Sequence, residues 1–239
     1  MTDLLADVVE AHGGLERWNA FTRVRGTVVS GGDLFVIKGV PQDPAPREQS
    51  VWLHEERCSL EPFGALDQKT DFTPERLTIE KLDGRIVAER DHPREAFAGH
   101  ELETPWDALD RAYFNGYAMW TYFTTPFLFT MPGFEVAEIE PWHERDQVWR
   151  GLDVTFPDGN PSHSTHQQFY FGSDNLLRRH DYHVDIAGGF AVAQYVYNII
   201  EADGIRLPSA RRAFRRDEQG RAWPGLVMVS IDISNVRFG

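Results

Sequence analysis

The sequence of 239 residues contains a single cysteine, Cys58. One thiol excludes an intrachain disulfide and any cysteine-rich metal site, and no motif around Cys58 is typical of a nucleophile. Basic residues are also fewer than acidic ones. The chain has 24 Lys and Arg and 37 Asp and Glu, which give a formal net charge of −13. Since an acidic surface repels phosphate backbones and anionic headgroups, we expect neither a nucleic acid nor a lipid bilayer as the main partner.

A long apolar run is missing as well. The most apolar stretch, residues 113–134, is interrupted by Asn115, Pro126 and Pro132, whereas a membrane-spanning helix needs about 20 mostly apolar residues. The N-terminal residues lack the positively charged region of a secretory signal peptide. The sequence therefore predicts a cytoplasmic protein without membrane insertion, and it leaves the oligomeric state open.

Motifs of cofactor-dependent and hydrolytic enzymes are absent too. The chain has no G-x-G-x-x-G, no Walker A motif, no G-x-S-x-G turn and no H-E-x-x-H. We therefore predict no cofactor and no metal. The alternative is a metal site that combines His166 with a histidine and an aspartate of residues 176–185, but solvated or hydrogen-bonded histidines are the simpler interpretation.

Periodicity predicts a fold rich in strands. Apolar residues make up 41% of the chain, which is ample for a core. Helical spacing predicts two short helices within residues 1–22, and period-two alternation then predicts strands, beginning with a hairpin of residues 24–30 and 34–40 around Gly31-Gly32-Asp33. Short turns between the strands after residue 133 indicate an antiparallel meander.

Because a large flat sheet curls, closes or splits, the predicted fold is mainly β (α+β): a highly curved antiparallel sheet, or unclosed β-barrel, of about 11–12 strands with helices packed in its mouth. No linker or repeat divides the chain, so residues 1–239 are predicted to form a single domain. Its parts are N-terminal helices in 1–22, N-terminal strands in 23–91, a helical aromatic plug or lid in 92–132 and the meander in 133–239.

Three segments resemble a known family. They are residues 11–18 (AHGGLERW), residues 168–182, which include LLRRHDY, and residues 205–212 (IRLPSARR). Together with the strand order they resemble the bacterial lipoprotein-carrier superfamily, the LolA/LppX-like fold, and in particular its soluble, uncharacterised members that begin with an A-H-G-G-x-x-x-W helix. The resemblance covers most of the chain. It implies an unclosed barrel wrapped over helices, with a hydrophobic cavity for an acyl chain or another apolar molecule. Because no signal peptide or lipobox is seen, lipoprotein transport itself is not carried over.

Aromatic residues are concentrated between positions 113 and 129. Four of them are the candidate wall of a ligand cavity: Tyr113, Tyr117, Trp120 and Phe123. Stacked rings supply apolar area, and tyrosine hydroxyls supply a few polar contacts. The alternative interpretation is a helix that fills the barrel as part of its core.

The predicted strand 176–185 has no purely apolar face. We place His180 and Tyr182 on its concave side, because the opposite face is charged or titratable at all positions but one. There they are candidate catalytic residues if the protein is an enzyme, with His180 moving a proton and Tyr182 holding an oxyanion. A buried hydrogen-bond network without chemistry is the alternative.

Two further residues are candidate ligand contacts. His166 stands at the start of a predicted strand, and Arg211 belongs to a basic strand in which Arg212 points to the opposite face. An inward Arg211 would clamp the carboxylate end of a ligand. Pairing of these arginines with surface acids is the alternative.

Three functions fit these features. The first is binding of a hydrophobic small molecule, lipid-like or polyketide-like, in the half-barrel cavity. The second is a cofactor-independent isomerase, cyclase or lyase that uses His180 as general acid and base in the same cavity. The third is an interaction module with a filled core. The expected partner is an apolar small-molecule ligand, and whether the protein is an enzyme stays open.

Overall fold

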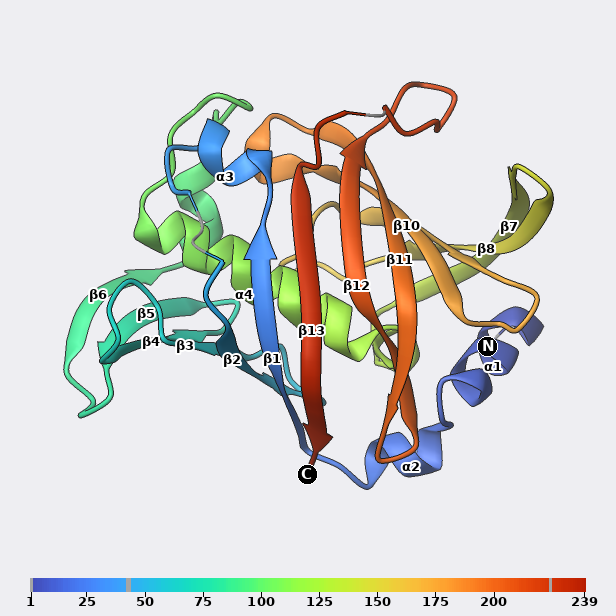
Figure 1. Cartoon of the computed structure of the whole chain (residues 1–239), viewed down its shortest axis with the longest axis horizontal. Coiled ribbons are helices and arrows are strands. Elements are labelled where there is room, and N and C mark those ends of the chain that lie inside the picture. Colours follow the sequence, from blue (N-terminus) through green and yellow to red (C-terminus); the bar gives the residue numbers. More distant parts are fainter. Residues whose placement is uncertain (1, 42–43, 224) are drawn as a thin grey trace.

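The computed structural model describes residues 2–41, 44–223 and 225–239. Within them, thirteen strands form one antiparallel sheet in the order β6-β5-β4-β3-β2-β1-β13-β12-β11-β10-β9-β8-β7 (Figure 1). The strands are β1 (Arg23–Gly31), β2 (Arg47–Trp52), β3 (Cys58–Glu61), β4 (Gln68–Phe72), β5 (Arg76–Lys81), β6 (Ile86–Asp91), β7 (Glu135–Glu144), β8 (Gln147–Thr155), β9 (His166–Phe171), β10 (Leu177–Val184), β11 (Phe190–Ala202), β12 (Ile205–Arg215) and β13 (Val229–Phe238). The α-helices are α1 (Asp3–Ala11), α2 (Leu15–Asn19), α3 (Asp33–Ile37) and α4 (Ala108–Thr124), and the 3₁₀ helices are η1 (Pro93–Phe97), η2 (Phe127–Thr130) and η3 (Asp185–Ala187).

The centre of the sheet joins the two ends of the chain. β1 pairs with β13, with Val28 opposite Ile233, and this pairing connects an N-terminal half (β1–β6) to a C-terminal half (β7–β13). Within each half, strands that follow one another in sequence lie side by side. The sheet bends around α4 (Figure 1), and the edge strands β6 and β7 of the described chain do not pair with each other. The predicted curved, unclosed antiparallel sheet with helices against it is confirmed.

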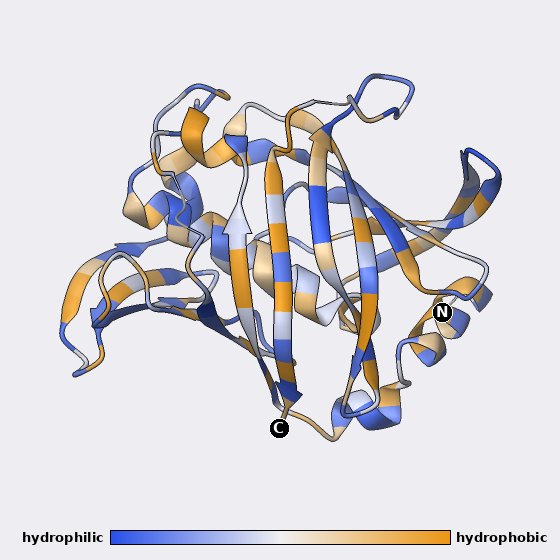
Figure 2. Ribbon diagram, viewed as in Figure 1, coloured by the Kyte–Doolittle hydropathy of each residue, from blue (hydrophilic) through white to orange (hydrophobic). Residues whose placement is uncertain are grey.

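Alternation along the strands separates a core face from an outer face. Apolar and polar residues alternate along the first half of β13 (Figure 2). The apolar positions of β13, such as Ile231 and Ile233, are buried in the same core as the rings of α4. The concave face of the sheet therefore packs on α4, which is the expected result of period-two patterning.

A capping box starts α4. Asp107 accepts a hydrogen bond from the backbone N–H of Asp110 (2.8 Å), and Asp110 accepts one from the backbone N–H of Asp107 (3.0 Å). Arg90 of β6 donates to both carboxylates, at 2.7 and 2.6 Å, and so fixes the start of the helix to the sheet edge. The capping bonds satisfy backbone donors that a helix start leaves free. No helix in the described ranges is both long and apolar enough to cross a membrane.

The backbone of α4 lies nearer the N-terminal half of the sheet, where its close neighbours include β2 to β6. A Cβ atom at Gly116 would stand 2.3 Å from the ring of Phe72 in β4, so the approach requires a residue without a side chain. Toward the C-terminal half, α4 makes its contacts through long side chains such as Tyr117 and Tyr122. The space between α4 and β9–β12 is thus filled by side chains.

Two predictions about the N-terminal half were wrong. The hairpin of residues 24–30 and 34–40 does not form, because α3 takes the place of its second strand and buries Leu34 and Phe35. Gly32 does not serve a hairpin turn. A Cβ atom there would stand 2.3 Å from the carbonyl oxygen of Met228, so the glycine allows a close backbone contact. Alternation also failed to indicate β4, whose sequence QKTDF is mostly polar.

Candidate functional site

A group of polar side chains is buried on the concave face, between α4 and strands β9–β12. We call it the inner cluster, and its members are Tyr122, His163, Gln167, His180, Tyr182, Gln194 and Arg211. Each is at most 2% exposed. Burial of so many polar groups is costly unless they bind one another or a ligand, so their partners decide what the site can do.

Gln194 of β11 is the central member. Its Oε1 accepts a hydrogen bond from Nη1 of Arg211 (2.9 Å), which fixes the orientation of the amide. Its Nε2 then donates to the hydroxyls of Tyr122 (2.7 Å) and Tyr182 (3.2 Å). The amide therefore links the helix to three neighbouring strands.

Arg211 of β12 carries a charge that the cluster does not balance. Its Nη2 donates to the backbone carbonyl of Tyr122 (3.0 Å), and its guanidinium lies 4.4 Å from the centre of the Tyr122 ring. Across the described chain no carboxylate pairs with it, and its buried Nε has no hydrogen-bond partner. Burial lowers the pKa of Arg211 from 12.5 to about 10, so the side chain is still a cation near neutral pH.

His180 is held as a neutral ring with a free lone pair. Nε2 of Gln167 donates to the carbonyl of Ser164 (2.8 Å), so its Oε1 faces His180 and accepts from Nε2 of the imidazole (2.6 Å). Nδ1 of His180 then carries the lone pair, and no described residue binds it. The ring stacks on Phe169 at 4.0 Å, and burial lowers the pKa of His180 well below 6.5. The partner of His180 is an amide, whereas a general base is usually oriented by a carboxylate.

His163 lies in the loop before β9 and completes the cluster. Its ring stacks on Tyr182 (3.9 Å), and its Nε2 is 2.9 Å from the hydroxyl of Tyr122. Nδ1 of His163 and the hydroxyl of Tyr117, whose ring is 5.1 Å away, are buried without hydrogen-bond partners among the described residues. Burial lowers the pKa of His163 from 6.5 to about 3. The cluster therefore contains several unsatisfied polar atoms.

The pKa of His163 predicts a loss of stability in acid. As the pH falls below 6.5 the unfolded chain takes up a proton at this histidine, whereas the folded chain does not until about pH 3. Between these values the residue lowers the free energy of unfolding by about 1.4 kcal/mol per pH unit. Between pH 6.5 and 5, the free energy of unfolding of His163→Gln is expected to fall by about 2 kcal/mol less than that of the wild type. Urea denaturation at the two pH values would measure this difference.

His166→Gln is the matched control for that measurement, because the ring of His166 is exposed to water in the folded protein. It is expected to follow the wild type at both pH values. Parallel pH dependences for the wild type and His163→Gln would contradict the predicted neutral state of His163.

The structure brings only part of the predicted site together. His180 and Tyr182 lie on the concave side, as the strand pattern predicts, and Arg211 points inward beside them. Tyr117 contacts the cluster through His163. The other predicted residues lie elsewhere.

Three of the predicted wall residues and one predicted contact, His166, are separate from the cluster. Nε1 of Trp120 donates to the backbone carbonyl of Trp52 (3.0 Å), toward β2. Tyr113 packs against Phe72 of β4, and Phe123 lies beneath β1 next to Gly26. His166 stands exposed at the start of β9, with Nδ1 3.2 Å from the hydroxyl of Thr155.

Sequence reasoning missed four members of the cluster, which are Tyr122, His163, Gln167 and Gln194. Gln194 is directly opposite His180 in the β10–β11 pairing, so a correct register would have pointed to it. His163 lies in a loop, and no periodicity indicates the burial of a loop residue.

A surface pocket of about 300 Å³ leads toward the cluster from the side of η1. Arg94 and Ser162 line it, and Nη1 of Arg94 donates to the carbonyl of Ser162 (3.1 Å), the residue before His163. Asn160 in the same wall donates to the buried Glu56 carboxyl (2.9 Å), whose pKa burial raises well above 4.5. The pocket therefore borders the loop that carries His163.

Comparison with solved structures identifies the architecture. The chain is similar to a LolA superfamily protein from Nitrosomonas europaea, with a TM-score of 0.52 and 9% identity over 97% of this chain and 90% of that one. It is also similar to an outer membrane lipoprotein-sorting protein domain from Vibrio parahaemolyticus, with a TM-score of 0.55 and 9% identity over 99% and 91%. The fold is LolA-like. No protein-family profile and no curated protein matches the sequence. At this identity the LolA-like likeness concerns the fold alone.

Proposed function

We propose that the protein binds a hydrophobic small molecule with an acidic head group, between α4 and strands β9–β12. The head group pairs with Arg211 in the inner cluster. The apolar part, lipid-like or polyketide-like, lies along the ring side chains of α4. The name of one of the two similar structures, which refers to lipoprotein sorting, fits a lipid-like ligand.

The unbalanced charge of Arg211 carries the proposal. A guanidinium buried among neutral partners costs several kcal/mol that a carboxylate would offset. Arg211 has a free Nε–H, and Nδ1 of His163 and Nδ1 of His180 are unsatisfied nearby. An acidic head group can accept from Arg211, and a polar atom beside it can bind a histidine. The cluster is therefore complementary to an anion rather than to a purely apolar molecule.

The position of α4 determines where the apolar part can go. Because the helix backbone lies nearer β2–β6, we propose that the apolar part displaces the side chains that α4 extends toward β9–β12 and not the helix itself. Each 100 Å² of apolar surface that the ligand buries there contributes about 2.5 kcal/mol to binding. The pocket beside Arg94 and Ser162 is the proposed entrance, since it borders the loop that carries His163.

Dodecanoate and dodecanol test the proposal, because they differ only in the head group. We expect dodecanoate to bind the wild-type protein about tenfold or more tightly than dodecanol, as measured by isothermal titration calorimetry at pH 7.5. Arg211→Gln should abolish that preference by weakening dodecanoate binding and leaving dodecanol binding unchanged.

Arg212→Gln is the matched control, because Arg212 is the next residue of β12 and pairs with Asp232 on the outer face (2.7 Å). It should keep the wild-type preference. Equal affinities in the wild type, or a preference that survives Arg211→Gln, would contradict the acidic head group. Binding of neither probe would contradict the proposal as a whole and support the filled-core interaction module.

A further inference from the structure

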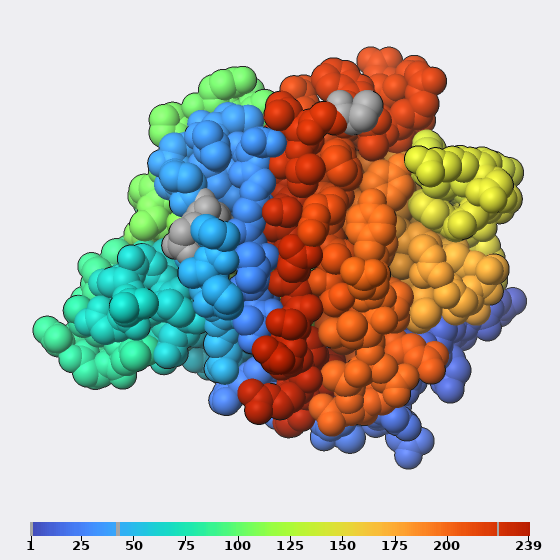
Figure 3. Space-filling model, viewed as in Figure 1, coloured from blue at the N-terminus to red at the C-terminus, as the bar shows by residue number. Residues whose placement is uncertain are grey.

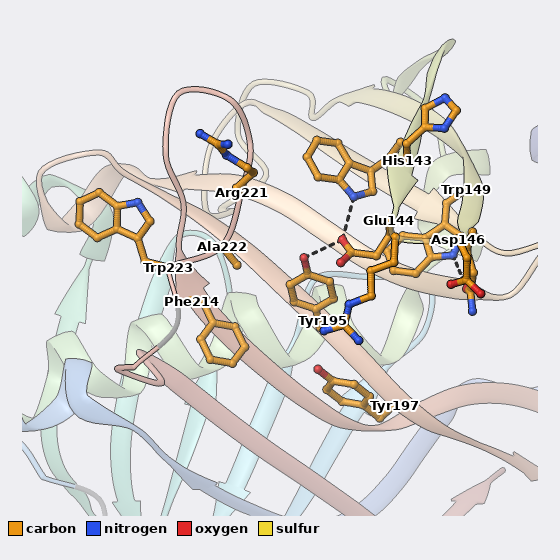
Figure 4. Close-up of a pocket in the computed structure, with 13 residues that line it drawn as sticks. His143, Glu144, Asp146, Trp149, Tyr195, Tyr197, Phe214, Arg221, Ala222 and Trp223 are labelled. Atoms are coloured by element: carbon orange, nitrogen blue, oxygen red, sulfur yellow. Dashed lines mark hydrogen bonds between the residues drawn. The ribbon is translucent and has the colours of Figure 1, made fainter.

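A second pocket lies on the outer face of the sheet, away from α4. Tyr195 and Tyr197 of β11 alternate with Gln194 and Val196, which are buried on the inner side, so the two tyrosines belong to the outer face. The pocket has a volume of about 640 Å³ and lies between the β7–β8 hairpin and the loop after β12 (Figures 3 and 4). We call it the outer groove.

Six aromatic residues line the outer groove: Trp142, Trp149, Tyr195, Tyr197, Phe214 and Trp223. Figure 4 shows Tyr195, Tyr197 and Phe214 on the floor, Trp149 beside the hairpin and Trp223 on the opposite loop. An adjoining pocket of about 420 Å³ shares Trp149 and both tyrosines and continues past Asn198. The two together make an elongated, open surface rather than a deep hole.

Three of the six aromatic side chains are held in place by hydrogen bonds before any ligand binds. The carboxylate of Glu144 accepts hydrogen bonds from Nε1 of Trp142 and from the hydroxyl of Tyr195, both at 2.9 Å (Figure 4). Nε1 of Trp149 donates to Oε1 of Gln147 (2.9 Å). Rings that are fixed in this way lose little conformational entropy on binding, which favours a recognition surface.

Charge around the groove argues for a neutral ligand. The guanidinium of Arg179 already lies 4.1 Å from the Trp142 ring centre and 5.4 Å from that of Tyr195, so a cation-binding aromatic cage is occupied by the protein itself. On the rim, Arg145 and Arg221 are matched by Glu144 and Asp146. The charged residues on the rim therefore give no net charge that would attract a cation or an anion.

The groove also differs from a lipid or peptide site. The described lining of the larger pocket is aromatic and polar, with Ala222 as its one aliphatic side chain, and the adjoining pocket adds Leu177, Val196 and Ile199. At the floor of the larger pocket Tyr195 pairs with Arg179 of β10 and with Arg212 of β12, so its backbone offers no free strand edge to an extended peptide. A ligand of the outer groove therefore needs flat apolar faces that pack on the aromatic rings and polar groups at its own edges.

We propose that the outer groove binds a neutral oligosaccharide. The C–H face of a pyranose ring is weakly positive and packs on the negative face of an aromatic ring. The hydroxyls at the edges of the sugar need planar polar partners. Such partners lie around the aromatic rings of the groove: His143, Asp146, Arg221 and the hydroxyl of Tyr197. The length of the two adjoining pockets accommodates more than one sugar unit. The proposal rests on observations independent of the inner cluster.

Maltotetraose, cellotetraose and chitotetraose are the probes for this site, because all three are neutral and differ in linkage and substituents. We expect at least one to bind saturably, as measured by titration of tryptophan fluorescence and by calorimetry. Trp223→Ala and Tyr197→Ala should each weaken that binding about tenfold. Both residues are about half exposed, at 52% and 47%, so the fold should survive the change, which thermal melts would verify.

Leu226→Ala is the matched control, since Leu226 is a 61% exposed apolar residue of the same loop that does not line the groove. Its affinity for the saccharide should equal that of the wild type. Absence of binding of all three tetrasaccharides at millimolar concentration, or binding that both groove variants leave unchanged, would overturn the proposal. Dodecanoate affinity should be the same in all variants, which separates this test from that of the inner cluster.

Discussion

Replacing Asp181 with alanine is expected to lower the free energy of unfolding by about 3–5 kcal/mol. The Asp181 carboxylate accepts hydrogen bonds from Nε and Nη2 of Arg179, at 2.6 and 2.7 Å, and lies 3.6 Å from Nε of Arg216. Arg179 is fully buried beneath Trp142 and also donates to the carbonyl of Gly220. Without Asp181 a buried guanidinium loses its main counterion, and urea denaturation would measure the cost.

Two comparisons make this result specific. Glu201→Ala removes an exposed ion pair with Arg206 (3.0 Å) and should cost less than about 1 kcal/mol. The double variant Arg179→Met with Asp181→Leu removes both charges and should recover most of the lost stability, because apolar residues can replace a buried pair. An Asp181→Ala variant as stable as Glu201→Ala would refute the buried pair as a stabilising element.

Trp120→Ala is the second change with a large expected effect, also about 3–5 kcal/mol. The Trp120 side chain is fully buried, and its indole N–H donates to the carbonyl of Trp52 in β2 (3.0 Å). Alanine leaves both a cavity and an unpaired carbonyl. Trp120→Phe keeps most of the ring and loses only the hydrogen bond, so it should cost about 1–3 kcal/mol.

Denaturation of the two Trp120 variants distinguishes packing from ligand contact. A role in the core predicts a large loss of stability in the alanine variant and unchanged dodecanoate affinity in the phenylalanine variant. Equal stabilities for the two variants would contradict the role of the indole in packing α4 against β2.

The part of the fold that depends on local pattern could be predicted from the sequence. The concentration of aromatic residues between positions 113 and 129 indicated a helical plug within residues 92–132, and the long helix α4 forms in that range. The meander after residue 133 likewise follows from alternation and short turns. These features need only neighbouring residues, so no knowledge of distant contacts was necessary.

The features that depend on distant contacts could not be predicted. Leu34 and Phe35 have strand-like composition, but the close approach of Gly32 to Met228 places them in a buried helix. Arg179 and Asp181 lie on the face that we expected to be exposed, yet the β7–β8 hairpin covers them. Their burial is a property of the assembled sheet and not of strand β10.

The candidate site likewise has one part that local pattern predicts and another part that depends on distant contacts. Alternation placed His180 and Tyr182 on the inner face, and it placed Arg211 and Arg212 on opposite faces without deciding which of the two points inward. The association of His163 with Tyr182 requires the loop before β9 to fold over the cluster, and nothing near His163 in the sequence encodes that contact. The roles of these residues in binding stay predictions for the experiments above.

The pairing of β1 with β13 has a consequence for biosynthesis. A ribosome makes β1 long before its partner β13, which is completed only when residues 229–238 have emerged from the exit tunnel. Until then each half of the sheet can form its own neighbouring pairs, while one side of β1 presents open hydrogen-bonding groups. The nascent chain therefore carries an open strand edge while residues 32–228 are being made, and a chaperone that shields such edges would have its target at residues 23–31.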